Sequence, residues 1–273
     1  MGIEAQAQVL VPTSPSTDPT GAQKTRIVII AVGGATCSGK TTLSEHLRQI
    51  LPNSTILHQD DFAPPVEKIP LHPIHNVKDW DDPKGAVDWS RLRSTFQYIR
   101  EHNGQFPPTH STHDHLNLQP DIPIPQSFAD SWRERFSSLM KSNIETRYVI
   151  ADGFLLYWDP EVVQNYDVKM FVRESYAVLK ERRRVRQIYN TAEGETWIDP
   201  PEYWDQIVWP AYLVAHEQMF VNKDVEKGPI DRSHPIAKDL IMLEAQSDAP
   251  PTESMRQFVD KTLEAVWAHL HPH

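Results

Sequence analysis

A glycine-rich segment near the N-terminus has the residue types and the spacing that bind phosphate. Residues 34–41 read GATCSGKT and match the P-loop pattern G-x-x-x-x-G-K-[ST]. In such a loop, backbone N–H groups surround phosphate oxygens, the lysine (Lys40) reaches the β- and γ-phosphates, and the hydroxyl group of Thr41 coordinates Mg²⁺. The residues expected to contact the nucleotide are Gly34, Ala35, Thr36, Cys37, Ser38, Gly39, Lys40, Thr41 and Thr42.

Carboxylates follow two predicted strands further along the chain. Asp152 comes directly after the apolar run Tyr148–Ala151, a position from which a carboxylate can hold Mg²⁺. Asp60 and Asp61 come directly after the predicted strand Ser54–Gln59. Transfer of phosphate to a hydroxyl group needs a base, and Asp61 is our candidate. Asp60 is the alternative, and only one of the two should face the γ-phosphate, because successive residues of a strand point to opposite sides.

Four arginines lie within five residues of the predicted helix Ser175–Tyr189: Arg182, Arg183, Arg184 and Arg186. A solvent-exposed basic face is the ordinary explanation of such a run. In a chain with a P-loop, we instead favour arginines that hold phosphate groups, because phosphoryl transfer needs cations near the developing charge.

Short apolar runs alternate with helical patterns, which predicts an α/β fold with a doubly wound parallel sheet of five strands. The helices are expected after the P-loop, after Asp88, over Ser127–Met140 and Ser175–Tyr189, over Asp199–Phe220 with a kink at Pro210, and over Thr252–Leu270. The predicted strands are Ile27–Val32, Ser54–Gln59, Tyr148–Ala151, Val168–Val172 and Leu240–Leu243.

Composition and low-complexity segments set the domain organisation. We expect one domain over residues 25–273, preceded by a disordered tail at 1–24 that is rich in proline, serine and threonine. A loop insertion is expected at 102–126. Its motif His110-x-x-His113-x-His115 is a weaker candidate for a metal site, because its spacing matches no zinc pattern and the chain's single cysteine is distant.

The overall charge excludes some classes of function. With 27 basic and 37 acidic residues the chain has a net charge of −10, which argues against a general nucleic-acid binder. No segment is long and apolar enough to span a membrane, and residues 1–24 do not have the pattern of a secretory signal. We expect a cytoplasmic protein.

The P-loop alone does not identify the reaction. The guanine-reading motif N-K-x-D of GTPases and the L-S-G-G-Q signature of transporter ATPases are both missing from the sequence. An acid after the second strand and a basic helix after the fourth suit the transfer of phosphate to a small acceptor.

Several segments together resemble the nicotinamide riboside kinases, which are P-loop nucleoside kinases related to uridine kinase. The resemblance covers about residues 26–220 and implies a P-loop kinase fold with a lid at about 175–198. The segments that carry it are GATCSGKTTL at 34–43, HQDDF at 58–62, DGFLL at 152–156, RRR at 182–184 and VWPAY at 208–212.

The resemblance implies the substrates and a set of acceptor-binding residues. ATP and Mg²⁺ would bind at the P-loop, and nicotinamide riboside or nicotinic acid riboside would be the acceptor. Asp61 would be the base for the ribose 5′-hydroxyl, and Asp81 would bind the ribose hydroxyls. Trp80 and Tyr189 would sandwich the nicotinamide ring, whose positive charge favours an aromatic face.

The resemblance also assigns two lid arginines: Arg183 would lie near the phosphates and Arg184 would bind the ribose. The sequence departs from the family at two positions. Asp152 stands where animal members have glutamate, and an arginine that the family often has near Gln187 is replaced, with Arg186 as its substitute.

Two other readings remain open. A uridine or cytidine kinase shares the P-loop and an acidic segment like Asp81-Asp82-Pro83, although the expected R-x-x-R-D lid pattern is missing from the sequence. A nucleotide-binding regulatory protein that does not transfer phosphate is the alternative from another class. An acid that points into a nucleoside-sized pocket would favour a kinase over a regulator.

Overall fold

A parallel five-stranded sheet forms the centre of the protein, in the order β2-β3-β1-β4-β7. The computed structural model describes residues 24–111, 121–139, 144–186, 188–190, 196–245 and 249–272, so the tail expected at 1–24 lies outside it except for Lys24. The strands are β1 (Lys24–Gly34), β2 (Ser54–His58), β3 (Ile144–Gly153), β4 (Val168–Arg173) and β7 (Leu240–Glu244). Every neighbouring pair is parallel, which confirms the predicted fold class.

The central strand β1 is apolar because both faces of the sheet are covered. Residues Val28–Val32 are fully buried, and Ile30 pairs with Ile150 of β3 on one side and Val168 of β4 on the other. A strand buried on two faces reads as a continuous apolar run rather than as an alternating one.

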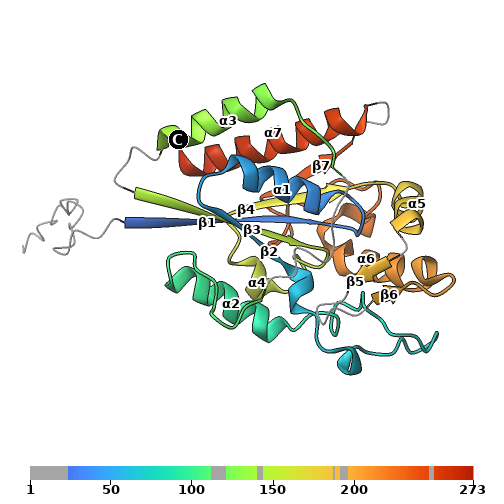
Figure 1. Ribbon diagram of the computed structural model, residues 1–273. Coiled ribbons are helices and arrows are strands. Elements are labelled where there is room, and N and C mark those ends of the chain that lie inside the picture. The colour runs from blue at the N-terminus through green and yellow to red at the C-terminus, as the bar shows by residue number, and fades with distance from the viewer. Residues whose placement is uncertain are drawn as a thin grey trace, which may run out of the picture.

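Helices cover the two faces of the sheet (Figure 1). One layer contains α1 (Lys40–Ile50), α3 (Gln126–Leu139) and α7 (Pro251–Leu270), and their apolar residues form one buried cluster with the sheet. The other layer contains α2 (Trp89–Glu101) and α4 (Pro160–Val163), which belong to a second cluster. Among the described residues, no helix has the length and apolar character needed to cross a membrane.

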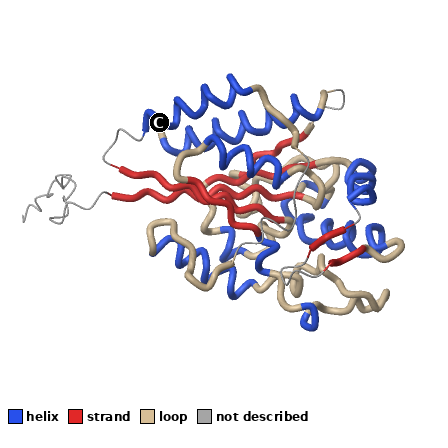
Figure 2. The backbone as a smooth tube through the Cα atoms, viewed as in Figure 1, coloured by secondary structure: helices blue, strands red, loops and turns tan. Residues whose placement is uncertain are grey.

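Further elements gather at the carboxyl ends of the strands, seen at the right of Figures 1 and 2. They are α5 (Tyr176–Arg186), the antiparallel pair β5 (Ile188–Asn190) and β6 (Thr196–Ile198), and α6 (Trp209–His216). Short 3-10 helices occupy Gln59–Phe62, Val66–Lys68, Glu217–Met219 and Val221–Lys223. Ligands of open α/β sheets bind at this edge.

The structure corrects two predicted elements. The helix expected over Ser175–Tyr189 ends at Arg186, and residues 188–190 and 196–198, which were not among the predicted strands, form β5 and β6. The kink expected at Pro210 takes the form of a π-helical segment, Trp204–Val208, directly before α6. Pro210 sits at the start of α6, where its missing N–H is tolerated.

Gly33 lets the sheet approach a buried tyrosine. A Cβ atom at this position would lie 2.4 Å from Cε2 of Tyr157, a ring that is 2% exposed and whose hydroxyl donates to the carbonyl of Met170 at 2.7 Å. We therefore expect Gly33→Ala to lower the free energy of unfolding by about 1–3 kcal/mol, because the ring has no room to move. Urea denaturation measures this change. In a Tyr157→Leu background the penalty should shrink, and an equal penalty in both backgrounds would contradict the steric cause.

Candidate active site

The P-loop has the backbone conformation of a phosphate cradle. Gly34, Cys37 and Gly39 have φ values of 142°, 62° and 98°, and a Cβ at Gly34 would lie 2.2 Å from the carbonyl oxygen of Val172. Helix α1 begins directly after Gly39, so its first N–H groups face the loop. The ammonium of Lys40 is buried and donates to the carbonyl of Ala35 at 2.9 Å.

Thr41 and Asp152, predicted to hold Mg²⁺, lie in direct contact. The Thr41 hydroxyl donates to Oδ2 of Asp152 at 2.7 Å, and Nδ1 of His58 lies 3.2 Å from the same oxygen. Burial works to raise the pKa of Asp152, but the hydrogen bond and charge of His58, the charge of Lys40 and the Thr41 bond outweigh it and lower the pKa. Asp152 is therefore ionised at neutral pH.

The donor set at Asp152 fits a hard cation that takes few ligands from the protein. Oδ1 of Asp152 is buried and has no hydrogen-bond partner among the described residues. Within the described part of the chain, no group of three or more His, Cys, Asp or Glu side chains could hold a metal ion. Mg²⁺ commonly binds through one or two protein oxygens, with phosphate and water oxygens completing its octahedron. Thr41 and Asp152 suit that mode.

Asp60 faces the phosphate-binding residues. It belongs to the 3-10 helix Gln59–Phe62, and solvent reaches its side chain. The surrounding protein nevertheless displaces enough water to raise the pKa of Asp60, and the charge of Asp152 adds to the rise while that of Lys40 opposes it. Asp152 and Lys40 are therefore the nearest charges that act on the Asp60 carboxylate according to the direction of its pKa shift.

Asp61, our sequence-based candidate for the base, lies in a different environment. It is 5% exposed, and its Oδ2 is 3.8 Å from Nε2 of His110. Its backbone carbonyl accepts a hydrogen bond from Arg91 at 2.5 Å. Asp61 thus packs beside His110 and Arg91, whereas Asp60 is exposed to solvent and has Asp152 and Lys40 as charged neighbours, and the choice of the base stays a prediction.

His110 corrects the expectation of a solvated insertion at 102–126. Its imidazole is 6% exposed and stacks on Phe62, with ring centroids 5.4 Å apart, and Phe106 lies 5.0 Å away. His113 and His115, the other members of the possible metal motif, lie outside the described residues. The sequence offered no sign of this contact, because its partners are distant along the chain.

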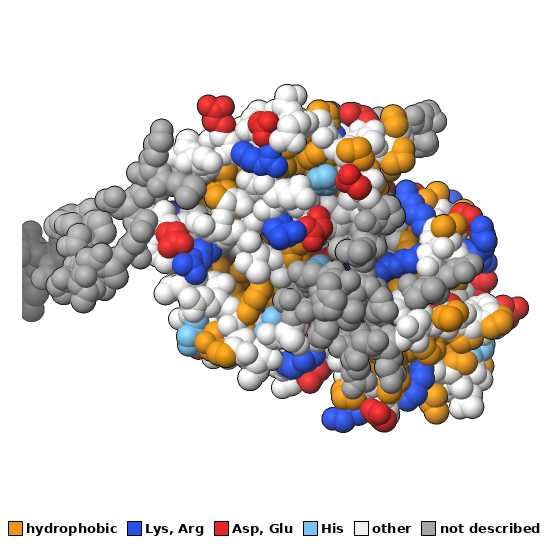
Figure 3. Space-filling view, viewed as in Figure 1, with side chains coloured by type: hydrophobic (Ala, Val, Ile, Leu, Met, Phe, Trp, Pro, Cys, Tyr) orange, Lys and Arg blue, Asp and Glu red, His pale blue; other side chains and the backbone are white. Residues whose placement is uncertain are grey.

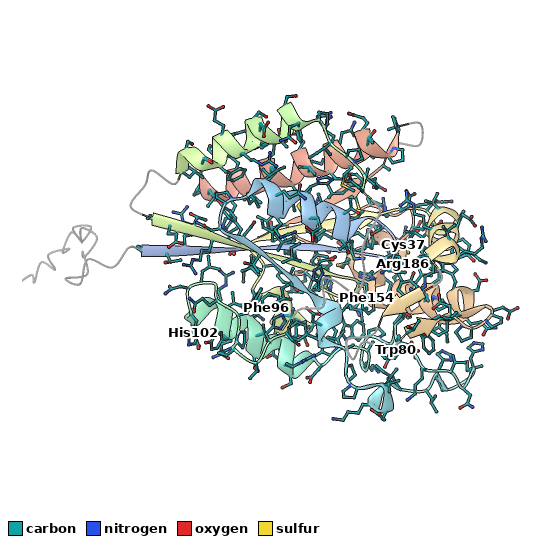
Figure 4. All side chains as sticks on the ribbon, viewed as in Figure 1. Cys37, Trp80, Phe96, His102, Phe154 and Arg186 are labelled. Atoms are coloured by element: carbon teal, nitrogen blue, oxygen red, sulfur yellow. The ribbon has the colours of Figure 1, made fainter. Side chains whose placement is uncertain are left out.

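Asp81 lines a pocket beside the P-loop. The side chain is buried, and apart from Asp81 and the P-loop residue Thr36 the lining is apolar or aromatic: Ala35, Phe154, Leu155, Trp204, Val208, Trp209 and Tyr212. Figure 4 shows Phe154, Trp80 and Cys37 at the same end of the molecule, away from Phe96 and His102. Burial raises the pKa of Asp81 to about 6, with Asp79 and Asp199 adding to the rise and Arg183 opposing it. A carboxylate among aromatic side chains offers a hydrogen-bond acceptor next to flat apolar surfaces.

Trp80 is fixed at the edge of this region by Tyr203. The backbone N–H of Trp80 donates to the Tyr203 hydroxyl at 3.1 Å, and that hydroxyl donates to the backbone carbonyl of Lys78 at 2.9 Å. The ring facing Trp80 is that of Trp197, with centroids 5.9 Å apart and planes at 60°. Trp197 was not among the residues predicted from the sequence. The only sequence feature that could have drawn attention to it is that an aromatic residue stands within a polar segment.

Tyr189 lies on the phosphate side rather than against Trp80. Its hydroxyl is 3.5 Å from Sγ of Cys37, and the guanidinium groups of Arg183 and Arg186 each lie 4.3 Å from the centre of its ring. Among the described residues, the ring in contact with Trp80 is that of Trp197, and the sandwich of Trp80 and Tyr189 around a bound ring stays a prediction.

The lid arginines divide into one buried and several exposed residues. Arg183 is buried, with Nε and Nη2 donating to Asp199 at 2.6 and 2.8 Å and Nη1 donating to Thr36 at 3.3 Å. Arg184 was expected to bind the ribose, but its side chain is 66% exposed and pairs with Glu181 along α5. This position does not support a ribose contact. Figure 3 shows basic side chains gathered at the end of the molecule where α5 lies.

Comparisons with known proteins point to one family, although a scan against protein-family models found no match. The chain is 32% identical to the nicotinamide riboside kinase of Schizosaccharomyces pombe over 207 residues, which cover 76% of this chain and 86% of that protein. It is 30% identical to that of Saccharomyces cerevisiae (74% and 82% covered) and 29% identical to nicotinamide riboside kinase 2 of Homo sapiens (71% and 70%). A solved sugar kinase from Janibacter sp. HTCC2649, at 14% identity and a TM-score of 0.42, is too distant to support an argument.

The buried carboxylate of Asp81 should make stability depend on pH. The folded protein keeps a proton on Asp81 up to pH about 6, whereas an unfolded chain releases it near pH ~4. The wild type therefore loses stability as the pH rises through this window. We expect Asp81→Asn to raise the free energy of unfolding at pH 7 by up to about 3 kcal/mol, and the gain to vanish at pH 4.

Urea denaturation at the two pH values measures this difference. The same substitution at the half-buried neighbour Asp82 is the matched control. An increase in the free energy of unfolding of Asp81→Asn that is equal at both pH values, or a decrease at pH 7, would contradict the raised pKa of Asp81.

Proposed function

The chain belongs to the nicotinamide riboside kinase family of nucleoside kinases, and we propose that it transfers the γ-phosphate of ATP to the ribose 5′-hydroxyl of nicotinamide riboside. The product would be nicotinamide mononucleotide. The observation that carries the proposal is the pocket beside the P-loop, in which the Asp81 carboxylate lies among aromatic side chains. An acceptor bound at Asp81 would have its hydroxyl group next to the phosphate-binding residues.

The phosphate side of the reaction is assigned to the P-loop and the lid. The backbone N–H groups of residues 34–42 and the ammonium of Lys40 bind the phosphates, and Thr41 with Asp152 holds Mg²⁺. When bound, Mg²⁺ neutralises charge that develops on the transferred phosphoryl group. Arg183 adds a positive charge from the lid, supported by its Nη1 contact with Thr36.

Asp60 is assigned as the base that accepts the proton of the 5′-hydroxyl. Its support is the solvent-accessible position near Lys40 and Asp152 and its raised pKa, which moves a carboxylate toward the range useful for proton transfer. Asp61, chosen from sequence, is instead assigned a structural role through its contacts with His110 and Arg91. Both acids belong to one 3-10 helix, so a direct comparison of the two separates these roles.

The acceptor side is assigned to Asp81 and Trp80. Ionised Asp81 can accept hydrogen bonds from the ribose 2′- and 3′-hydroxyls, and Arg183 stands close enough to lower its pKa. Trp80 offers an aromatic face to the pyridinium ring, whose positive charge favours it. The neutral bases of uridine and cytidine would gain less from this wall.

A panel of acceptors tests the reaction. We expect Mg²⁺-dependent consumption of ATP with nicotinamide riboside and nicotinic acid riboside to exceed that with uridine, cytidine or no acceptor. Initial rates at matched concentrations, with product mass confirmed by mass spectrometry, measure the preference. Faster turnover of uridine or cytidine would support the assignment as a nucleoside kinase but contradict the proposed preference for pyridine ribosides. No turnover with any acceptor would favour the regulatory reading.

The choice of base gives a second test. We expect Asp60→Asn to lower kcat by about 10²–10⁴-fold, because the proton acceptor is lost, while the Kd of a non-hydrolysable ATP analogue changes little. Asp61→Asn is the matched control and should lower kcat far less. The opposite order of the two effects would make Asp61 the base.

A further inference from the structure

Asp199 connects two parts of the active site through one carboxylate. Its Oδ2 accepts from Nε of Arg183 at 2.6 Å, and its Oδ1 accepts both from Nη2 of Arg183 at 2.8 Å and from the indole Nε1 of Trp197 at 2.9 Å. Charge-assisted, bidentate pairs of this kind fix geometry as well as contribute energy. Asp199 thus orients a lid arginine and an aromatic side chain together.

The bidentate pair determines which edge of Arg183 remains for phosphate. Nε and Nη2 are directed at Asp199, and Nη1 is directed at Thr36 of the P-loop, 3.3 Å away. The guanidinium is planar and rigid, so a rotation of the carboxylate also rotates the Nη1 edge. Because Arg183 is 8% exposed, loss of its partner would leave a buried charge uncompensated.

Trp197 forms the other end of the connection. Its ring lies 5.9 Å from that of Trp80 and 5.5 Å from that of Tyr203, the residue that fixes the Trp80 backbone. The indole N–H directed at Asp199 sets the orientation of the ring. Trp197 therefore contacts the proposed acceptor wall on one side and the lid ion pair on the other.

We propose that Asp199 is a positioning residue that couples the aromatic wall for the acceptor to the lid arginine at the phosphates, through the Trp197 N–H. A ring bound against Trp80 and Trp197 and a nucleotide bound at the P-loop then influence each other through this carboxylate. The part that concerns the acceptor rests on the proposed function. The connection from Trp197 to the P-loop does not, so it can be tested with nucleotide alone.

A double-mutant cycle tests this connection. Trp197→Phe keeps an aromatic ring but removes the N–H donor, and Asp199→Asn removes the charged bidentate acceptor. The Kd of adenylyl imidodiphosphate with Mg²⁺ is measured by isothermal titration calorimetry without acceptor. We expect about three- to tenfold weaker binding for Trp197→Phe, at least about tenfold for Asp199→Asn, and no more than about twofold further loss when the two are combined.

A similar indole–carboxylate pair elsewhere provides the matched control. Nε1 of Trp132 in α3 donates to Oδ1 of Asp260 in α7 at 3.0 Å. Trp132→Phe and Asp260→Asn make the same chemical changes and should leave the Kd of the analogue unchanged. Thermal unfolding of all variants verifies that each is folded.

Two results would overturn the coupling: unchanged analogue binding by Trp197→Phe, or additive effects in the double variant. If Asp199→Asn does not fold, Trp197→His decides, because its imidazole restores a ring N–H near the indole position. The His variant must bind the analogue more tightly than the Phe variant, and equal binding would overturn the proposal. If the double-mutant cycle shows the expected non-additive effects but the protein does not phosphorylate nicotinamide riboside, the proposed acceptor is rejected and the coupling is retained.

Discussion

The parallel pairing of β1 with β3 is the constraint on which the active site depends. In this register Val32, next to the P-loop, lies beside Asp152, and β2 places His58 on the other side of the same residue. The pairing that buries the apolar strand residues thus also delivers a carboxylate to Thr41. A register shift of one residue would turn the strand's side chains to the opposite faces, so the core and the position of the Asp152 carboxylate are specified together.

The balance of charge at this edge favours cationic ligands. Asp60, Asp81 and Asp152 lie near Lys40 and Arg183, and their mutual repulsion with burial raises the pKa of Asp60 and of Asp81. Only Asp152, with its hydrogen bonds from His58 and Thr41, has a lowered pKa. Under the proposed function, Mg²⁺ on the phosphate side and the pyridinium ring on the acceptor side would each offset part of this negative charge, and uridine has no such charge.

The sequence was sufficient where function depends on contiguous residues. The apolar runs located all five strands, and the P-loop spacing located Lys40 and Thr41, because each signal lies within one segment. The choice between Asp60 and Asp61 could not be made this way. It assumed the alternation of a strand, whereas residues 59–62 form a 3-10 helix in which successive side chains do not alternate between two faces.

Contacts between distant segments were the part that sequence could not supply. His110 packs on Phe62 across 48 positions of chain, and Trp197 of the short strand β6 meets Trp80, which lies 117 positions earlier. Neither contact leaves a periodic pattern, because an isolated side chain that fills a tertiary gap has no neighbours at regular spacing.

The arginine run on α5 shows how burial separates roles that the sequence leaves equivalent. Arg184 pairs with Glu181 on the exposed surface, a kind of ion pair that contributes little to stability. Arg183, one residue earlier, faces inward, where a guanidinium without a partner would be costly. Its burial therefore requires Asp199, and Asp199 in turn accepts from Trp197. The buried guanidinium beside Thr36 thus shares its carboxylate with an aromatic side chain, so the Arg183–Asp199 ion pair and the Trp80–Trp197 contact form one connected unit.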